Sequence, residues 1–243
     1  TLFNFVRLRK AGFLSISPFM ETADKFKTSI PRDTLGRALR DLRISVTDQC
    51  NLRCGYCMPE KVFGPNHAFL QKEEILTFEE IILVAEAFAC CGGKKIRLTG
   101  GEPLLRPNLP ELVRSLRAIG GIKEIALTTN GLLLPKHAAE LKAAGLDRVT
   151  LSLDSLDEKT FRRMSGRDVS VQKALEGIRC AEEAGLTIKV NAVIIRHQNE
   201  DQVLQLAEHF RGTAHVLRFI EFMDVGNCNQ WTPEKVYTGR EIL

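Results

Sequence analysis

From residue 42 to residue 222 the sequence repeats one pattern, in which a short β-rich run is followed by an amphipathic stretch with helical spacing. The β-rich runs cover residues 42–47, 95–100, 124–130, 148–154, 188–195 and 215–222. Helices are predicted over residues 78–91, 109–119, 136–144, 171–184 and 200–210. Strands that alternate with helices are typical of βαβ units with parallel strands. Because six such strands follow one another without a reversal, we expect an α/β fold, a partial TIM-type (βα)6 barrel.

The predicted strands alternate polar and apolar residues, whereas a parallel strand covered on both faces is nearly all apolar. In the second strand, for example, Arg97 and Thr99 share one face while Ile96 and Leu98 share the other. Period-2 alternation in most of the strands gives the sheet one polar face. We therefore expect helices on the apolar face and a wet or ligand-filled lumen on the polar face. A solvent-facing sheet is the alternative, and the βαβ rhythm disfavours it.

The expected lumen carries an excess of positive charge. Arg43, Arg97 and Lys189 point to the polar face, and only Asp154 opposes them. Buried cations without partners are costly, so an anionic ligand is expected to supply the countercharge. Arginine suits phosphate because its planar group donates two hydrogen bonds at once.

Three of the seven cysteines, Cys50, Cys54 and Cys57, lie within eight residues directly after the first predicted strand. That loop belongs to the C-terminal face, where α/β barrels carry their chemistry. Structural zinc uses four protein ligands, and a redox CxxC pair would leave Cys50 unexplained. Three thiolates on a four-iron cluster leave one iron free for another ligand. The spacing favours such a 4Fe–4S cluster, and zinc with His67 as fourth ligand is the alternative.

Composition agrees with an ordinary globular chain. Of the 243 residues, 44% are hydrophobic and 26% are charged, which excludes disorder and a coiled coil as descriptions of the whole chain. The net charge of +4 gives no argument for nucleic acid, and no apolar run approaches the roughly 18 residues of a membrane span. We interpret the scattered cysteines as packing residues in a reducing compartment; they are Cys90, Cys91, Cys180 and Cys228.

The cysteine triad, with Tyr56 between its last two members, resembles the radical S-adenosylmethionine (SAM) superfamily. The run Gly100-Gly101-Glu102-Pro103, at the end of the second predicted strand, is similar to the glycine motif of that superfamily. The resemblance implies that the open iron binds SAM and that one electron from the cluster releases a 5′-deoxyadenosyl radical. In such enzymes the cofactor carries the chemistry, while the protein orients it and excludes water.

Over residues 33–243 the motifs are more narrowly similar to the GTP 3′,8-cyclase family, lyases of the first step of molybdenum cofactor biosynthesis. These motifs are residues 42–45, 50–59, 97–103, 128–131, 152–156, 189–191 and 218–223. The resemblance implies conversion of GTP to 3′,8-cyclo-7,8-dihydro-GTP, starting with hydrogen abstraction at C3′. It implies GTP contacts from Arg43, Arg97, Thr128 and Lys189. It implies SAM contacts from Tyr56, Gly101, Ser152 and Met223.

The sequence departs from this family at its ends. The family holds a second 4Fe–4S cluster in a C-terminal region, and the cysteine ligands of that cluster are absent here. We expect residues 1–32 to be an N-terminal extension, partly disordered or a leader, and residues 33–243 to be the barrel. The second-cluster region is expected to be missing from a C-terminally truncated chain, which leaves turnover of GTP by this chain open.

The resemblance also implies partners. We expect an electron donor such as flavodoxin or ferredoxin, a downstream cyclic pyranopterin monophosphate synthase, and a homodimer as an open alternative, with no nucleic acid and no membrane. A cytoplasmic location is expected, with the mitochondrial matrix as the alternative in a eukaryote. Two other interpretations stay open: another radical SAM enzyme, such as a peptide-modifying one, and a non-enzymatic module that binds a metal or cluster.

Overall fold

The computed structural model describes residues 30–224 and 228–243. The expected extension over residues 1–32 therefore falls almost entirely outside the described residues. The division of the chain at residue 33 stays a prediction.

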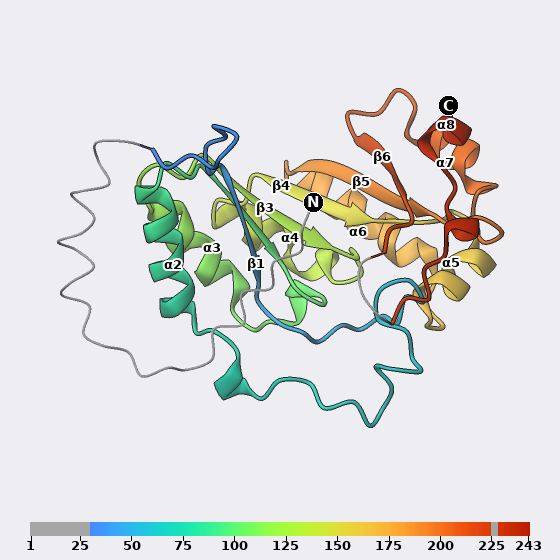
Figure 1. The fold of residues 1–243 in the computed structure, drawn as a ribbon, viewed down its shortest axis with the longest axis horizontal. Helices are drawn as coiled ribbons and strands as arrows, with labels where there is room; N and C mark the ends of the chain where they lie inside the picture. The colour runs from blue at the N-terminus through green and yellow to red at the C-terminus, as the bar shows by residue number, and fades with distance from the viewer. Residues whose placement is uncertain (1–29, 225–227) are drawn as a thin grey trace.

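Six strands form one parallel sheet in the order in which they occur along the chain (Figure 1). They are β1 (Asp41–Ser45), β2 (Lys95–Thr99), β3 (Glu124–Thr129), β4 (Arg148–Ser152), β5 (Thr187–Ile194) and β6 (Val216–Glu221). A parallel sheet with sequential order, joined by helices, is the arrangement that the alternating pattern predicts. The predicted α/β partial barrel is confirmed.

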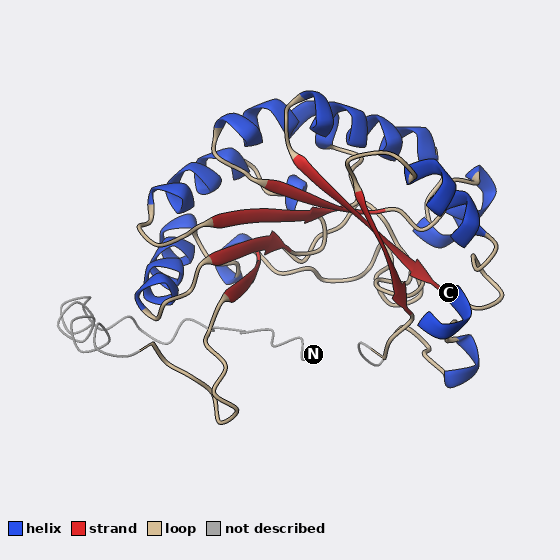
Figure 2. Cartoon of the chain, turned by 90° about the horizontal axis from the view of Figure 1, so that it is seen from above, coloured by secondary structure: helices blue, strands red, loops and turns tan. Residues whose placement is uncertain are grey.

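The helices lie along the convex side of the curved sheet and leave its concave side open (Figure 2). The larger ones are α2 (Phe78–Cys90), α3 (Leu109–Ala118), α4 (Leu134–Ala143), α5 (Glu158–Ser165), α6 (Val171–Glu183) and α7 (Gln202–Phe210). Short helical elements are η2 (Lys72–Glu74), η3 (Pro103–Leu105), η4 (Pro233–Lys235) and α8 (Gly239–Ile242). In the part of the chain that is described, no helix combines the length and apolarity that a bilayer crossing needs.

The core lies between the sheet and the helices. Ile96 and Leu98 of β2 are fully buried, while Arg97 between them is only half-buried and faces the other side. Leu112 and Leu116, one turn apart on α3, are also fully buried. Each such side chain contributes roughly 1.5–3 kcal/mol when it is buried completely. The strand alternation therefore fixes which face of the sheet the helices cover.

Local signals fix the ends of several helices. Thr77 and Glu80 form the expected capping box at the start of α2. Gly145 and Gly185 follow α4 and α6 with φ angles of 103° and 74°, which glycine adopts without strain.

Helix α5 is an element that the sequence pattern does not predict. Asp157 begins it by accepting a hydrogen bond from the backbone N–H of Thr160, and Gly166 ends it with a φ angle of 63°. Its two turns are too short for a clear helical period.

Candidate functional site

The cysteines lie on a segment that we call the triad loop, residues 46–58. The loop begins by extending the pairing of β1 with the end of β2. The N–H of Val46 donates to the carbonyl of Thr99 at 2.8 Å, and the N–H of Gly101 donates to the carbonyl of Thr47 at 2.8 Å. The triad loop is therefore fixed against the glycine motif by backbone hydrogen bonds.

This contact explains why two glycines follow β2. A Cβ atom at Gly100 would lie 2.3 Å from the carbonyl oxygen of Thr47, and one at Gly101 would lie 2.2 Å from that of Gln49. Side-chain atoms cannot approach a backbone oxygen so closely without displacing it. The glycines thus allow the two loops to touch, and the predicted contact of Gly101 with SAM stays a prediction.

Glu102, in the same motif, joins the segment after β2 to the end of β3 from a fully buried position. Its carboxylate accepts hydrogen bonds from Thr129 Oγ1 at 2.7 Å, from the N–H of Asn130 at 2.8 Å and from the N–H of Leu104 at 3.1 Å. Burial raises the pKa of this carboxyl, and the three donors oppose that effect. Asn130 in turn donates from Nδ2 to Asn51 Oδ1 of the triad loop at 2.7 Å.

Arg53 holds the middle of the triad loop together. Its guanidinium donates to the carbonyls of Cys50 and Leu52, both at 2.7 Å, and to that of Phe63 at 2.6 Å. The N–H of Arg53 donates to the carbonyl of Ser165 at the end of α5. The loop is therefore anchored to the helix layer as well as to the sheet.

Tyr56 anchors the loop to β4 and β5. Its hydroxyl donates to Asp154 Oδ2 at 2.7 Å, and Asp154 Oδ1 accepts from the N–H of Val193 at 2.8 Å. Burial is the main reason why the pKa of Asp154 rises to about 6. Asp154 thus bonds Tyr56 and the backbone of Val193 just beyond the end of β4, and the expectation that it opposes the lumen cations stays a prediction.

The three thiols fit an iron–sulfur cluster in their chemistry. Burial is the main cause that raises the pKa of Cys50 and of Cys54, and it raises that of Cys57 to about 11. The neighbouring thiols add to the rise at Cys54 and Cys57, which shows that the three groups lie near one another. Thiols in such surroundings become thiolates when iron supplies the positive charge.

Within residues 30–224 and 228–243, no three His, Cys, Asp or Glu side chains come close enough together to hold one metal ion. His67 packs against Phe63 and Phe69, with ring centroids 4.6 and 4.7 Å away. The zinc alternative with His67 stays a prediction.

The concave face of the sheet, which we call the lumen, is arranged in three layers by the strand register. Cα partners place Arg43, Arg97 and Arg148 at the level furthest from the triad loop. Thr128, Thr150 and Lys189 form the middle level. Ser152, Asn191 and Arg218 form the level at the carboxyl ends of the strands, next to the triad loop.

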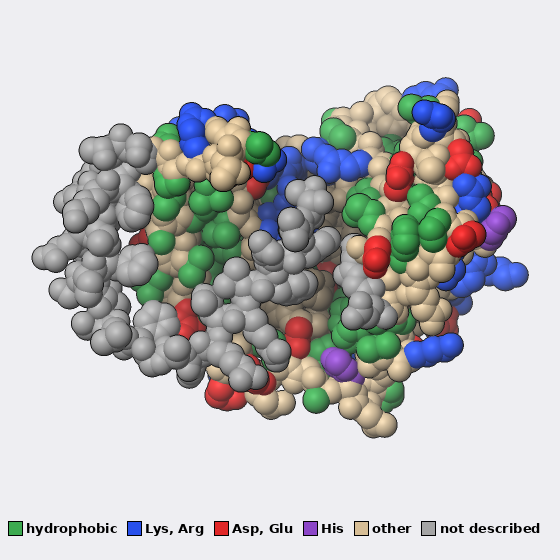
Figure 3. Space-filling view, in the orientation of Figure 1, with side chains coloured by type: hydrophobic (Ala, Val, Ile, Leu, Met, Phe, Trp, Pro, Cys, Tyr) green, Lys and Arg blue, Asp and Glu red, His purple; other side chains and the backbone are tan. Residues whose placement is uncertain are grey.

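Positive charge gathers in this lumen, and blue Lys and Arg side chains are visible in the central hollow of Figure 3. Partial burial, followed by the guanidinium groups of Arg43 and Arg148, lowers the pKa of Arg97. Loss of solvation, followed by Arg148 and Arg218, lowers the pKa of Lys189. Glu124 pairs with Lys95 at 3.1 Å and with Arg148 at 2.8 Å. The sequence argument treats the lumen cations as buried, whereas the structure leaves them half-buried or exposed.

Three lumen side chains leave a buried polar atom without a partner among the described residues. They are Arg148 Nε in the layer furthest from the triad loop, Thr128 Oγ1 in the middle layer and Asn191 Oδ1 in the layer beside the triad loop. Buried polar atoms are normally hydrogen-bonded, and exceptions point to a missing ligand or water.

The remaining predicted SAM residues lie around one end of the lumen. Ser152 is half-buried at the end of β4, and Met223, just after β6, is 51% exposed. Tyr56 lines a cavity of about 180 Å³ together with Ile195 and Phe222. Burial raises the pKa of Tyr56 well above its usual range, so its hydroxyl stays protonated.

Sequence reasoning missed several residues that the structure brings to the site. Arg148 is two residues before Thr150 on the same strand, so period-2 alternation could have found it. Arg218 lies on β6, whose faces the pattern does not separate clearly. No sequence signal marks the bond between Asp154 and Tyr56, since 98 residues separate them.

Comparisons with known proteins agree with this geometry. A model described as the Radical SAM superfamily matches residues 44–210. The chain is 54% identical over 213 residues to a GTP 3′,8-cyclase of Acidothermus cellulolyticus, covering 87% of this chain and 59% of that protein. It is 52% identical over 216 residues to a GTP 3′,8-cyclase of Xanthomonas axonopodis pv. citri, covering 88% and 64%. The chain thus spans about three fifths of the length of these curated relatives.

A solved structure shares the fold. The crystal structure of Streptococcus suis SuiB bound to precursor peptide SuiA matches with a TM-score of 0.60. The match covers 84% of this chain and 43% of that one at 19% sequence identity. At this identity the likeness supports the partial barrel and says nothing about substrate.

Proposed function

The chain belongs to the radical SAM superfamily, and we propose that its reaction is the cyclisation of GTP to 3′,8-cyclo-7,8-dihydro-GTP, the first step of molybdenum cofactor biosynthesis. Membership in the superfamily implies a 4Fe–4S cluster and SAM. When bound, they would supply a 5′-deoxyadenosyl radical that takes hydrogen from C3′ of the ribose. Identity above 50% to proteins named GTP 3′,8-cyclase supports this reaction.

The observation that carries the proposal is the cationic lumen below the triad loop. Arg43 and Arg97 lie opposite each other on β1 and β2, an unfavourable arrangement of like charges. A triphosphate would offset this repulsion and accept paired hydrogen bonds from the guanidinium groups. Lys189 and Arg218 would add charge nearer the triad loop.

The layers give the substrate a direction. If the phosphates lie among the arginines of the layer furthest from the triad loop, the ribose would lie nearer the carboxyl ends of the strands. The unpartnered Thr128 hydroxyl would hydrogen-bond GTP there. Ser152, in the layer next to the triad loop, would contact SAM. This orientation brings the C3′ position of GTP toward the triad loop rather than away from it.

The triad loop would hold the cofactors. Cys50, Cys54 and Cys57 would ligate three irons of the cluster, and the hydrogen bond from Tyr56 to Asp154 would keep the loop closed over the lumen. Tyr56, Gly101 and Met223 are the proposed further contacts to SAM.

The reaction also needs partners. We propose a small one-electron donor of the flavodoxin or ferredoxin type, and a cyclic pyranopterin monophosphate synthase that consumes the product. We place the reaction in the cytoplasm, or in the mitochondrial matrix of a eukaryote.

The test uses protein reconstituted with iron and sulfide without air, then mixed with dithionite, SAM and GTP deuterated at C3′. We expect about four irons per chain, and 5′-deoxyadenosine that carries deuterium. Detection of 3′,8-cyclo-7,8-dihydro-GTP by mass spectrometry would establish the complete reaction. If the 5′-deoxyadenosine carries no deuterium and its yield does not depend on GTP, another radical SAM reaction, such as peptide modification, would be favoured instead. One zinc and no iron would point to a non-enzymatic module.

A further inference from the structure

A second concave site borders the triad loop and shares no residue with the lumen layers. It is a groove of about 530 Å³ between the triad loop, the start of α4 and the segment that joins α5 to α6. Asn51 and Leu52 form the wall on the triad loop, and the groove includes none of the lumen cations. Leu132, Leu133, Pro135 and Val169 give it an apolar floor. We call it the outer groove.

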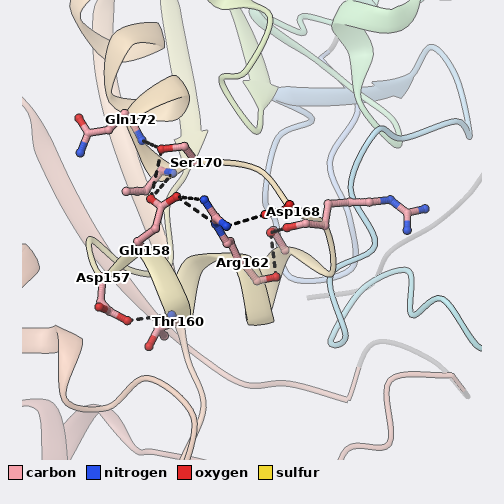
Figure 4. A network of polar contacts seen from close by, with 10 residues as sticks. Asp157, Glu158, Thr160, Arg162, Asp168, Ser170 and Gln172 are labelled. Carbon is pink, nitrogen blue, oxygen red and sulfur yellow. Dashed lines mark hydrogen bonds and ion pairs between the residues drawn. The ribbon is translucent and has the colours of Figure 1, made fainter.

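The charges around the outer groove are unbalanced. Of the two acidic residues, Asp168 pairs with Arg162 at 2.6 Å and Glu176 pairs with Arg179 at 3.8 Å. Figure 4 shows Asp168 as one end of a network that continues through Arg162 and Glu158 to Ser170. Arg162 also pairs with Glu158, and Arg179 also pairs with Glu183, so each of these arginines is shared between two carboxylates.

The basic residues of the groove are less compensated. Arg167 pairs with Glu60 at 2.5 Å. Lys136 and Lys173 are exposed, and neither forms an ion pair within the described ranges. The outer groove therefore combines an apolar floor with two exposed lysines that have no ion-pair partner among the described residues, a combination suited to an acidic partner.

The wall of this groove touches the cluster ligands. The N–H of Leu52 donates to Cys50 Sγ at 3.4 Å, and the thiol of Cys50 lies 3.9 Å from Asn51 Oδ1. A molecule bound in the groove would contact Leu52, whose N–H is hydrogen-bonded to the Sγ of Cys50. The lumen side of the loop, by contrast, is where SAM and substrate would lie.

We propose that the outer groove is the docking site of the electron donor, and that this donor is a small acidic flavin protein of the flavodoxin type. This inference rests on the proposed function, because a radical SAM enzyme needs one electron for each SAM that it cleaves. The apolar edge of an exposed flavin can contact the apolar floor of the groove. The iron–sulfur cluster of a ferredoxin is enclosed by its own backbone and would leave the groove unfilled. The anionic flavin hydroquinone loses one electron and becomes the neutral semiquinone, while the cluster goes from the 2+ to the 1+ state. No proton moves and no bond breaks.

The test reverses the two rim charges in the variant Lys136→Glu/Lys173→Glu of the full chain. Its dissociation constant for flavodoxin is measured at about 0.05 M and about 0.5 M salt, because exposed charges are screened at the higher concentration. We expect binding at least tenfold weaker than that of the native chain at low salt, and a much smaller difference at high salt. Lys123→Glu is the matched control, since this exposed lysine precedes β3 at the opposite end of the sheet. It should bind like the native chain.

A second measurement separates the groove from the chemistry. Reconstituted native chain and variant should form 5′-deoxyadenosine equally fast with dithionite, while only the variant is slow with reduced flavodoxin. Unchanged flavodoxin affinity in the variant, or equal weakening by Lys123→Glu, would overturn the docking site. Binding of ferredoxin but not flavodoxin would overturn the assigned donor. If no chain forms 5′-deoxyadenosine with dithionite, the proposed function fails, and the affinities still decide whether the groove binds the donor.

Discussion

Replacing Arg97 by methionine should make the ligand-free protein more stable and the GTP complex less stable. Arg97 lies opposite Arg43 in the strand register, and Arg43, Arg148 and Arg218 all disfavour its positive charge. Like charges directly opposite on neighbouring strands cost up to about 1 kcal/mol. Methionine keeps most of the apolar stem of arginine and removes the charge. In a domain of this size, about 1 kcal/mol corresponds to a rise of roughly 2–4 °C in Tm.

The same change removes a contact to phosphate. A charge-assisted hydrogen bond contributes roughly 1.5–3 kcal/mol, which equals a loss of about 10- to 150-fold in GTP affinity. A ligand stabilises the folded state according to its affinity. At saturating GTP the native chain should therefore have a higher Tm than Arg97→Met, the reverse of the order without GTP. Thermal unfolding with and without GTP measures both effects, and titration calorimetry gives the affinity.

Arg97→Lys is the control for this prediction. It keeps the positive charge, so it should show little of the added stability, while losing part of the affinity because lysine cannot make the paired hydrogen bonds. Iron content after reconstitution should be unchanged in both variants. The reasoning would be refuted if Arg97→Met lowered the Tm of the ligand-free protein, or if its GTP affinity equalled that of the native chain.

Three further predictions concern the triad loop and its supports. Asp154 has a folded-state pKa of about 6 against an ordinary value of 3.8, so its contribution to stability is most favourable at low pH. This contribution is lost as pH rises through 6, by up to about 3 kcal/mol. Asp154→Asn should flatten the pH dependence of stability in urea unfolding of the cluster-free protein, and an unchanged pH profile would contradict this prediction. Gly101→Ala would force a Cβ against the Gln49 carbonyl, so it should lower stability by roughly 1–3 kcal/mol and reduce the iron retained after gel filtration, whereas full retention would show that the loops separate freely. Cys54→Ala should retain no four-iron chromophore while Cys180→Ala on α6 retains it, and equal loss in both variants would refute the assigned ligands.

The sequence predicted the architecture well because period-2 alternation and helix caps are local signals. Ile96 and Leu98 identify the covered face of β2 without any knowledge of the rest of the fold. Helix α5 was missed because only Phe161 and Met164 mark its apolar side, and two turns give no repeat. Its own ends, Asp157 and Gly166, were the usable signals.

The site was predictable only where its residues lie in one short segment or on one strand face. The cysteine spacing and the glycine motif identify the triad loop and its partner. The role of Glu102 as a buried junction depends on Thr129 and Asn130, which are 27 and 28 residues away. Such contacts depend on where β2 and β3 end, and strand ends are set by packing rather than by local pattern.

The lumen and the outer groove differ in how far solvent reaches their cations. Arg97 in the lumen is half-buried, and its pKa is lowered. Part of the space between Arg97 and a bound triphosphate would be protein rather than water, so their attraction would be screened less than at the surface. Lys136 and Lys173 at the outer groove are exposed, so salt screens them within about 10 Å. These lysines border a groove whose wall residue Leu52 is hydrogen-bonded to Cys50, a proposed cluster ligand. The different screening suits the different partners, because a substrate must be held through a slow reaction while an electron donor must leave after each transfer.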